Sequence, residues 1–203
     1  MTVLLVAFLL AAAPAPAAPS PGPVPPPRAG DPLPRVALRT PLGEIVLEVD
    51  VVRAPVSARN FLRYVDARRY DGGAFHRTVT TRPDNQPRNA VKIDVVQAGA
   101  APGEDFPPIP LERTRDTGLA HVDGAISMAR DGPDTATSDF FVCVGPQPEL
   151  DHGGRRNPDG QGFAAFGRVV KGMDVVRKIH AAPAQGQSLR PPVPILEAVR
   201  LPP

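Results

Sequence analysis

Prolines divide this chain into two parts with different structural possibilities. Of its 203 residues 28 are proline, and they crowd the segment from Pro19 to Pro34. Because proline lacks a backbone N–H and has a fixed φ, this segment cannot continue a helix or a central strand. We expect residues 18–34 to be a semi-rigid, extended linker and residues 35–203 to form one folded domain.

The residues before the linker have the pattern of an export signal. Residues 3–13 form an apolar run of the length found in signal peptides, and the run is too short for a comfortable membrane span. Ala15-Pro16-Ala17 fits a small-x-small cleavage site, although no basic residue precedes the run. We expect residues 1–17 to be a cleaved signal peptide, with an uncleaved anchor as the alternative. The mature chain is then periplasmic or secreted, without stable membrane insertion.

Periodicity beyond residue 34 predicts a mainly β domain with two helices. Two runs of alternating apolar and polar residues, 35–39 and 44–50, flank a Pro/Gly turn and predict a hairpin. Apolar residues at helical spacing predict one amphipathic helix after Pro55 and a short one at 173–180. The absence of regular βαβ alternation favours an antiparallel barrel or sandwich. Further short apolar stretches predict strands at residues 75–79, 91–98, 125–129, 140–144, 163–170 and 195–201.

Composition and motifs argue against several classes of function. A formal net charge of +2 lacks the concentrated basic surface that nucleic-acid binding needs. The 4 histidines are scattered, so they predict no metal site. Ser127 and Ser138 lack the Gly-x-Ser-x-Gly pattern of a hydrolase nucleophile. Cys143 is the single cysteine, and its apolar surroundings predict a buried side chain rather than a reactive thiol.

Eight short segments recur in a characteristic order and spacing across nearly all of residues 35–201. They are Thr40-Pro41-Leu42-Gly43-Glu44-Ile45, Ala54-Pro55-Val56, Asn60-Phe61-Leu62, Phe75-His76-Arg77, Gln97-Ala98-Gly99, Ile126-Ser127-Met128-Ala129-Arg130, Ser138-Asp139-Phe140-Phe141 and Phe166-Gly167-Arg168-Val169-Val170. Together these segments resemble the cyclophilin family. The resemblance implies an eight-stranded antiparallel β-barrel capped by two α-helices, which agrees with the periodicity. It also implies catalysis of cis/trans rotation about Xaa-Pro bonds, a reaction that needs no metal or cofactor.

The resemblance also implies a set of site residues. Arg77 matches the family's catalytic arginine, which stabilises the twisted amide from beside the prolyl nitrogen. Gln97 matches a glutamine that binds the substrate backbone, and Phe141 matches a wall of the proline-ring pocket. The other positions expected to bind substrate are Met128, Leu150, Phe163 and Asp139. Expected partners are proline-containing peptides and unfolded exported proteins, bound by a monomer.

The chain departs from the family pattern at four places. Asp94 stands where an aromatic pocket wall is usual, so we expect it to add a carboxylate to the proline pocket. Asp139 replaces a glutamine, Phe163 replaces a histidine, and Glu149 replaces a tryptophan that favours cyclosporin binding. The altered pocket leaves an alternative function open, in which a cyclophilin-like module binds proline-containing chains with little turnover.

Overall fold

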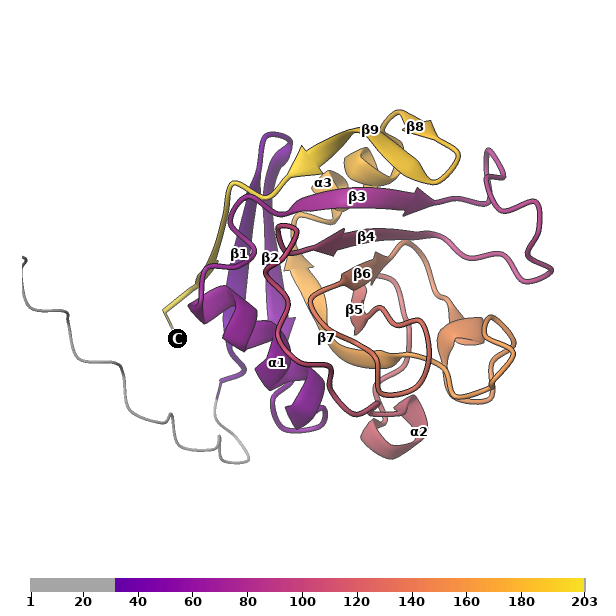
Figure 1. Cartoon of the computed structure of the whole chain (residues 1–203), viewed down its shortest axis with the longest axis horizontal. Coiled ribbons are helices and arrows are strands. Elements are labelled where there is room, and N and C mark those ends of the chain that lie inside the picture. The colour runs from indigo at the N-terminus through magenta and orange to yellow at the C-terminus, as the bar shows by residue number, and fades with distance from the viewer. Residues whose placement is uncertain (1–31, 203) are drawn as a thin grey trace, which may run out of the picture.

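The structure, a computed structural model, describes residues 32–202; the predicted signal peptide and most of the predicted linker lie outside the described residues. In this range ten strands form one antiparallel sheet in the order β10-β1-β2-β7-β5-β6-β4-β3-β9-β8 (Figure 1). The strands are β1 Arg35–Thr40, β2 Gly43–Val49, β3 Ala74–Val79, β4 Val95–Gly99, β5 Ala125–Met128, β6 Phe140–Cys143, β7 Ala164–Lys171, β8 Ala184–Gln185, β9 Ser188–Pro194 and β10 Glu197–Arg200.

The mainly β, antiparallel architecture is confirmed, but the eight-stranded closed barrel is not. The sheet of the described residues has ten strands, and its outer strands β10 and β8 do not pair with each other. The strands that the sequence did not predict are β8 and β9, and β9 contains three prolines. It tolerates them because its pairing with β3 shifts register between Val193 and Ser188, which brackets Pro191 and Pro192.

Three α-helices, rather than two, lie in the described range. The two expected helices are α1 Pro55–Asp66 and α3 Met173–His180, and the third is the four-residue α2 Thr114–Thr117. A 3-10 turn, η1 Pro148–Leu150, precedes a long loop. Helix α1 begins at a proline and lacks a side-chain cap of its own. Instead, Glu112 accepts hydrogen bonds from the free N–H groups of Val56 (2.9 Å) and Ser57 (2.7 Å).

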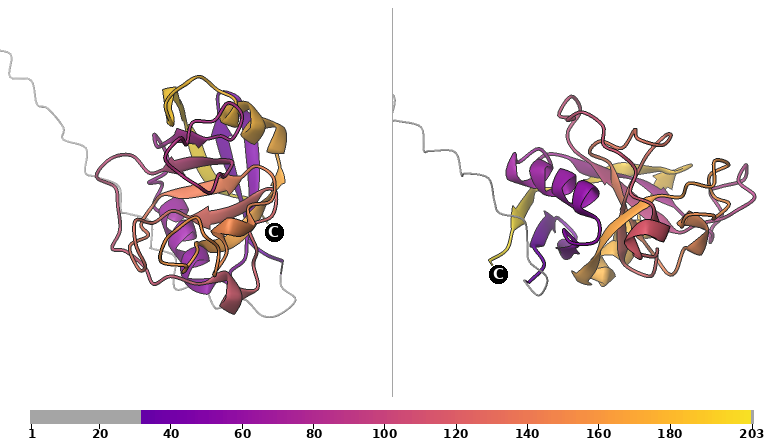
Figure 2. Two further views of the ribbon diagram at one scale, coloured as in Figure 1. Left: turned by 90° about the vertical axis from the view of Figure 1, so that its right-hand side faces the viewer. Right: turned by 90° about the horizontal axis from the view of Figure 1, so that it is seen from below.

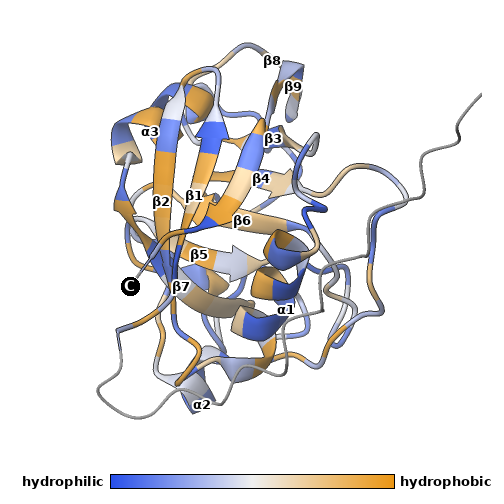
Figure 3. Ribbon diagram, turned by 90° about the vertical axis from the view of Figure 1, so that its left-hand side faces the viewer, coloured by the Kyte–Doolittle hydropathy of each residue, from blue (hydrophilic) through white to orange (hydrophobic). Residues whose placement is uncertain are grey.

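Strand alternation creates two separate apolar clusters on the two faces of the sheet. The larger cluster includes Val96 of β4 and Phe140 and Val142 of β6, and both longer helices pack into it. The smaller cluster contains the alternate residues Val95, Phe141 and Cys143. In Figure 3 the central strands are coloured mostly hydrophobic, whereas α1 mixes hydrophobic with hydrophilic residues, as expected for a helix with one buried face.

Two long loops extend from the same side of the molecule. One joins β3 to β4 and includes residues 80–94, and the other follows η1 and includes residues 151–162. Both project away from α1 in the views of Figure 1 and the right panel of Figure 2. No helix within residues 32–202 is long and apolar enough to cross a membrane.

Candidate active site

A cavity of about 650 Å³, called here the site cavity, lies over the smaller apolar cluster. Six of the seven residues that the sequence predicted for the site line it: Arg77, Gln97, Asp139, Phe141, Leu150 and Phe163. They come from β3, β4, β6, η1 and the segments that flank them. Its other lining residues are Asn89, Ile93, Val95, Asp105, Ala129, Arg130, Asp131, Thr135, Thr137, Arg156, Asn157 and Pro158.

Arg77 is half-buried, and three hydrogen bonds fix its guanidinium. Nη1 donates to Gln97 Oε1 on β4 at 2.9 Å, while Nε and Nη2 both donate to Gln187 Oε1 at 2.9 and 2.6 Å. Burial lowers the pKa of Arg77, and the charge of Asp139 acts in the opposite direction. Because a guanidinium nevertheless keeps its proton at physiological pH, the site cavity holds a positive charge in a fixed position.

A β-bulge in β3 brings two adjacent side chains to the same part of the site. The pairing of β3 with β4 shifts between Phe75 and Arg77, so His76 is the extra residue on its strand. Without the bulge, alternation would send His76 and Arg77 to opposite faces. The imidazole Nε2 of His76 lies 3.1 Å from Asp139 Oδ2.

Asp139 completes a continuous polar chain. Its Oδ2 accepts a hydrogen bond of 2.6 Å from Gln97 Nε2, and Gln97 in turn accepts from Arg77. The side-chain amide of Gln97 is therefore oriented from both ends, which leaves one of its two N–H groups free for a substrate carbonyl. Gly99 makes room for this arrangement, since a Cβ at that position would lie 1.9 Å from Asp139 Oδ1.

The apolar part of the cavity is built around Phe141. The rings of Phe141 and Phe163 meet edge to face with centroids 5.3 Å apart, and Leu150 is almost fully buried against them. Ile93 and Val95 supply the facing side wall. An apolar ring of modest size fits such a surface, and it would lie beside the guanidinium of Arg77.

Two predictions about the pocket residues are wrong in their geometry. Met128 does not line the site cavity, because strand alternation turns it into the larger cluster while its neighbour Ser127 pairs with Phe141.

Asp94 does not add a carboxylate to the pocket. Its carboxylate accepts hydrogen bonds from the backbone N–H and hydroxyl of Thr81, both at 2.8 Å, and Ile93 and Val95 line the wall instead. Glu149 lies outside the lining, bound to Arg155.

A serine, a histidine and an aspartate line up beneath Phe141 in the order known from hydrolases. The His121 ring stacks on Phe141 with centroids 5.9 Å apart; its Nδ1 lies 2.7 Å from Asp151 and its Nε2 lies 2.9 Å from Ser127. Ser127 is 0% exposed and His121 is 2% exposed, so no substrate reaches the hydroxyl. The group therefore supports Phe141 from below as part of the buried structure under the site cavity.

Sequence reasoning missed several residues of the site. Gln187 holds Arg77 from the turn between β8 and β9, a region without any periodic signal. Arg156 reaches the cavity from the loop after η1. The alternation of Ile93, Val95 and Gln97 in the sequence, which continues from the loop into β4, was the signal that could have placed the first two in the wall. Residues 32–202 contain no group of three or more His, Cys, Asp or Glu side chains arranged to hold a metal ion.

Fold and site together place an apolar wall and a fixed cation in one cavity on an antiparallel sheet. Residues 35–200 match the family model described as "Cyclophilin type peptidyl-prolyl cis-trans isomerase/CLD", and the chain belongs to this family. Among similar proteins, Peptidyl-prolyl cis-trans isomerase A of Dickeya dadantii (strain 3937) is 40% identical over 146 residues, covering 71% of this chain and 70% of the relative. The chain is thus a peptidyl-prolyl isomerase by family and enzyme class.

Two further comparisons agree. Peptidyl-prolyl cis-trans isomerase of Acinetobacter baylyi is 34% identical over 163 residues, covering 78% of each chain. In structure, the chain is similar to the cyclophilin type peptidyl-prolyl cis-trans isomerase of Cryptosporidium parvum, with a TM-score of 0.65 and 19% identity, covering 84% of this chain and 99% of that one. At this identity the structural likeness supports the fold.

Proposed function

We propose that this enzyme accelerates cis/trans rotation about Xaa-Pro bonds in proline-containing segments of exported proteins and so assists their folding. One observation carries the proposal: two glutamines hold the Arg77 guanidinium in the site cavity, whose apolar wall contains Phe141. Phe141, Leu150 and Phe163 take the proline ring, and Gln97 and Asp139 position the backbone beside it.

The chemistry follows from the barrier of the uncatalysed reaction. Amide resonance sets that barrier at about 18–20 kcal/mol, and it is highest where the bond is twisted by a quarter turn. There the prolyl nitrogen is pyramidal and its lone pair is localised. A donor that is already fixed near this nitrogen stabilises the twisted amide more than either planar form, which is the condition for catalysis. Arg77 supplies that donor, and the free N–H of Gln97 binds a neighbouring carbonyl.

The alternative of a binding module with little turnover loses its main argument. That argument was a carboxylate from Asp94 in the proline pocket, and the carboxylate is instead bound to Thr81. The wall that remains, formed by Ile93 and Val95, is apolar and suits a pyrrolidine ring. We therefore favour catalysis over simple binding.

An exchange experiment tests the catalytic role. The interconversion rate of an Xaa-Pro peptide is measured by NMR with the wild type, Arg77→Ala and a control, Arg59→Ala, which removes an exposed arginine on α1. Removing a donor fixed near the developing lone pair is expected to lower kcat/KM by about 10²–10³-fold. The control should retain the wild-type rate. Equal rates for Arg77→Ala and wild type would favour the binding module.

The export route is a proposal that rests on the sequence of residues 1–34. The apolar run, the small-x-small motif and the proline-rich linker support secretion or a periplasmic location, with the isomerase domain as a soluble monomer. N-terminal sequencing of the protein recovered from its native host tests it, with a mature start after Ala17 as the expected result. An intact Met1 in a membrane fraction would favour the anchor.

A further inference from the structure

We propose that Arg156 makes this site selective for proline segments that carry a carboxylate next to the proline. The inference rests on the proposed function, because it concerns the substrate of the same cavity. The carboxylate is supplied by an acidic side chain adjacent to the proline or by the free carboxylate of a chain that ends there.

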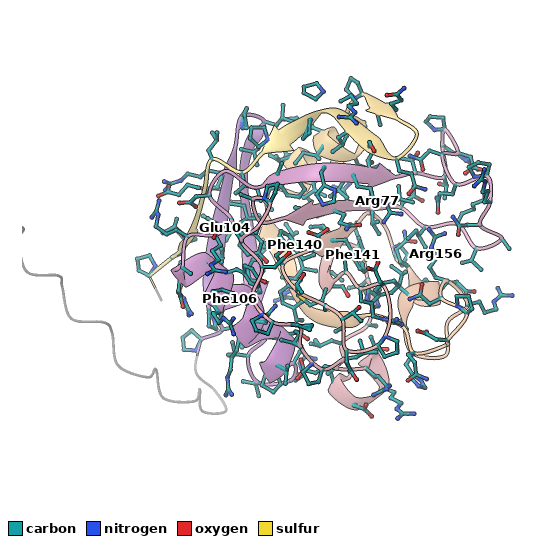
Figure 4. All side chains as sticks on the ribbon, in the orientation of Figure 1. Arg77, Glu104, Phe106, Phe140, Phe141 and Arg156 are labelled. Atoms are coloured by element: carbon teal, nitrogen blue, oxygen red, sulfur yellow. The ribbon has the colours of Figure 1, made fainter. Side chains whose placement is uncertain are left out.

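Arg156 joins the two long loops at one end of the site cavity. Its Nη1 donates to Gln86 Oε1 (2.9 Å) and to the carbonyl of Val91 (2.6 Å), both in the loop before β4. Gln86 is fully buried and also bonds to the backbone of Ile93, a wall residue of the pocket. The guanidinium is thus held against the apolar wall. Figure 4 shows Arg156 on the loop side of Phe141, with Arg77 on the strand above them.

The charge of Arg156 has no counter-ion among residues 32–202. Three arginines line the cavity: Arg77, Arg130 and Arg156. The charge of Arg130 is neutralised by two hydrogen bonds to the carboxylate of Asp159. Arg77 and Arg156 form no ion pair with any carboxylate of residues 32–202. In that range Arg156 donates only through Nη1, so its Nε and Nη2 remain as a fork that matches a carboxylate.

The half-buried position makes this lone charge unusual. Desolvation lowers the pKa of Arg156, and the positive charge of Arg77 lowers it further. Two guanidiniums in one cavity raise its potential, and an incoming anion would relieve both the repulsion and the loss of hydration. A neutral substrate would leave the charge uncompensated.

The cavity also carries negative charge. Asp105, Asp131 and Asp139 are among its lining residues. The Asp139 carboxylate lies against Gly99 at the end of β4, whereas Arg156 bonds to Gln86 and Val91 in the loop before β4, so the two charges lie toward opposite ends of this strand. A substrate carboxylate would be repelled by the aspartates and attracted by Arg156. The field along the cavity therefore selects where an acidic group binds.

Paired peptides test the inference on the full enzyme. The isomerisation rate and the affinity are measured by NMR for peptides with Glu or Gln immediately before the proline, with Glu or Gln immediately after it, and for Ala-Pro with a free or an amidated terminus. The wild type is expected to prefer the carboxylate member of at least one pair by about tenfold. In Arg156→Gln this ratio should fall to about one. Equal values within all three pairs for the wild type would overturn the inference, as would a preference that survives Arg156→Gln.

Two controls separate charge from structure. Arg155→Gln removes the neighbouring arginine, which is exposed and paired with Glu149, and should keep the wild-type ratio.

Arg156→Lys retains the charge and should keep part of the carboxylate preference. In the wild type, 1 M salt should reduce this preference, because the ion pair between Arg156 and the substrate carboxylate is partly exposed. A role for Arg156 limited to bracing the loops predicts no salt effect. Because affinity is measured beside turnover, a protein that binds the peptides without isomerising them would refute the proposed function and still test the carboxylate preference.

Discussion

Gly99 faces the carboxylate of Asp139 so closely that a Cβ on Gly99 would lie 1.9 Å from Oδ1. No left-handed backbone conformation explains this glycine, since Gly99 is absent from the positive-φ residues. Its role is to let the carboxylate lie over β4 and accept the 2.6 Å hydrogen bond from Gln97. The orientation of Gln97, and through it that of Arg77, therefore depends on the absence of a side chain at residue 99.

Replacing Gly99 by alanine is expected to lower kcat/KM by about tenfold, because the displaced carboxylate gives up a charge-assisted hydrogen bond worth about 1.5–3 kcal/mol. Asp139→Ala removes the same interaction from the other side. The double variant should lose little more than either single variant, since both act through one contact. Steady-state kinetics of the four proteins measure the coupling. Fully additive losses would show that Gly99 and Asp139 act independently.

Gln187 is expected to be a positioning residue. Its Oε1 accepts two of the three hydrogen bonds that fix Arg77. Gln187→Ala should lower kcat by about tenfold with KM nearly unchanged, because a misplaced guanidinium weakens mainly the twisted state. Gln185→Ala, an exposed glutamine of β8, is the matched control and should behave as wild type. A change confined to KM would place Gln187 in substrate binding instead.

Periodicity explains which elements could be predicted. The helices α1 and α3 bury one face each, and β1 and β2 alternate large apolar residues with charged or smaller ones, so their apolar residues repeat at 3.6 or 2 and appear directly in the sequence. Strand β9 buries only Leu189 and Val193 and contains prolines, so no comparable signal exists there. Closure of the sheet depends on how its outer strands meet, which a local pattern does not encode.

The same limit applies to the site. The positions of Arg77, Gln97 and Phe141 around one cavity followed from the family resemblance, and the structure brings them together. The sequence placed Met128 near the cavity, and alternation could have corrected this. Because Ser127 pairs with Phe141, the next residue, Met128, lies on the opposite face of the sheet. Gln187 and Arg156 reach the cavity from a turn and a loop, and their places depend on tertiary contacts that no spacing in the chain predicts.

Alkaline pH is expected to destabilise the fold through Tyr70. Its side chain is fully buried and donates a 2.7 Å hydrogen bond to the carbonyl of Ser138. Burial raises the pKa of Tyr70 well above that of a free phenol. The unfolded chain therefore releases this proton at lower pH than the folded one, so the contribution to stability is complete below about pH 10 and is lost as the pH rises toward the folded-state value.

Absorbance measures this directly, because the chain has 2 tyrosines and no tryptophan. The phenolate signal of Tyr70 should appear only together with loss of the far-UV circular dichroism signal. Tyr70→Phe should lower the free energy of unfolding by about 1–3 kcal/mol at pH 7, since the Ser138 carbonyl loses its donor. It should also reduce the decline above pH 10. A phenolate spectrum for both tyrosines in a fully folded protein would contradict the prediction.

Cys143 is expected to be inert in the folded protein although it lies directly behind the cavity. It is 0% exposed, and burial raises the pKa of its thiol far above the usual range, so almost no thiolate exists at neutral pH. A disulfide reagent such as DTNB at pH 8 should react with less than about a tenth of the folded molecules within an hour, and with one thiol per chain in denaturant. Cys143→Ala serves as the blank.

Because the thiol packs with Phe141 and Val95, slow modification that keeps pace with unfolding would report local opening of the site floor. Rapid modification of the native enzyme would mean that the floor under Phe141 is open to solvent.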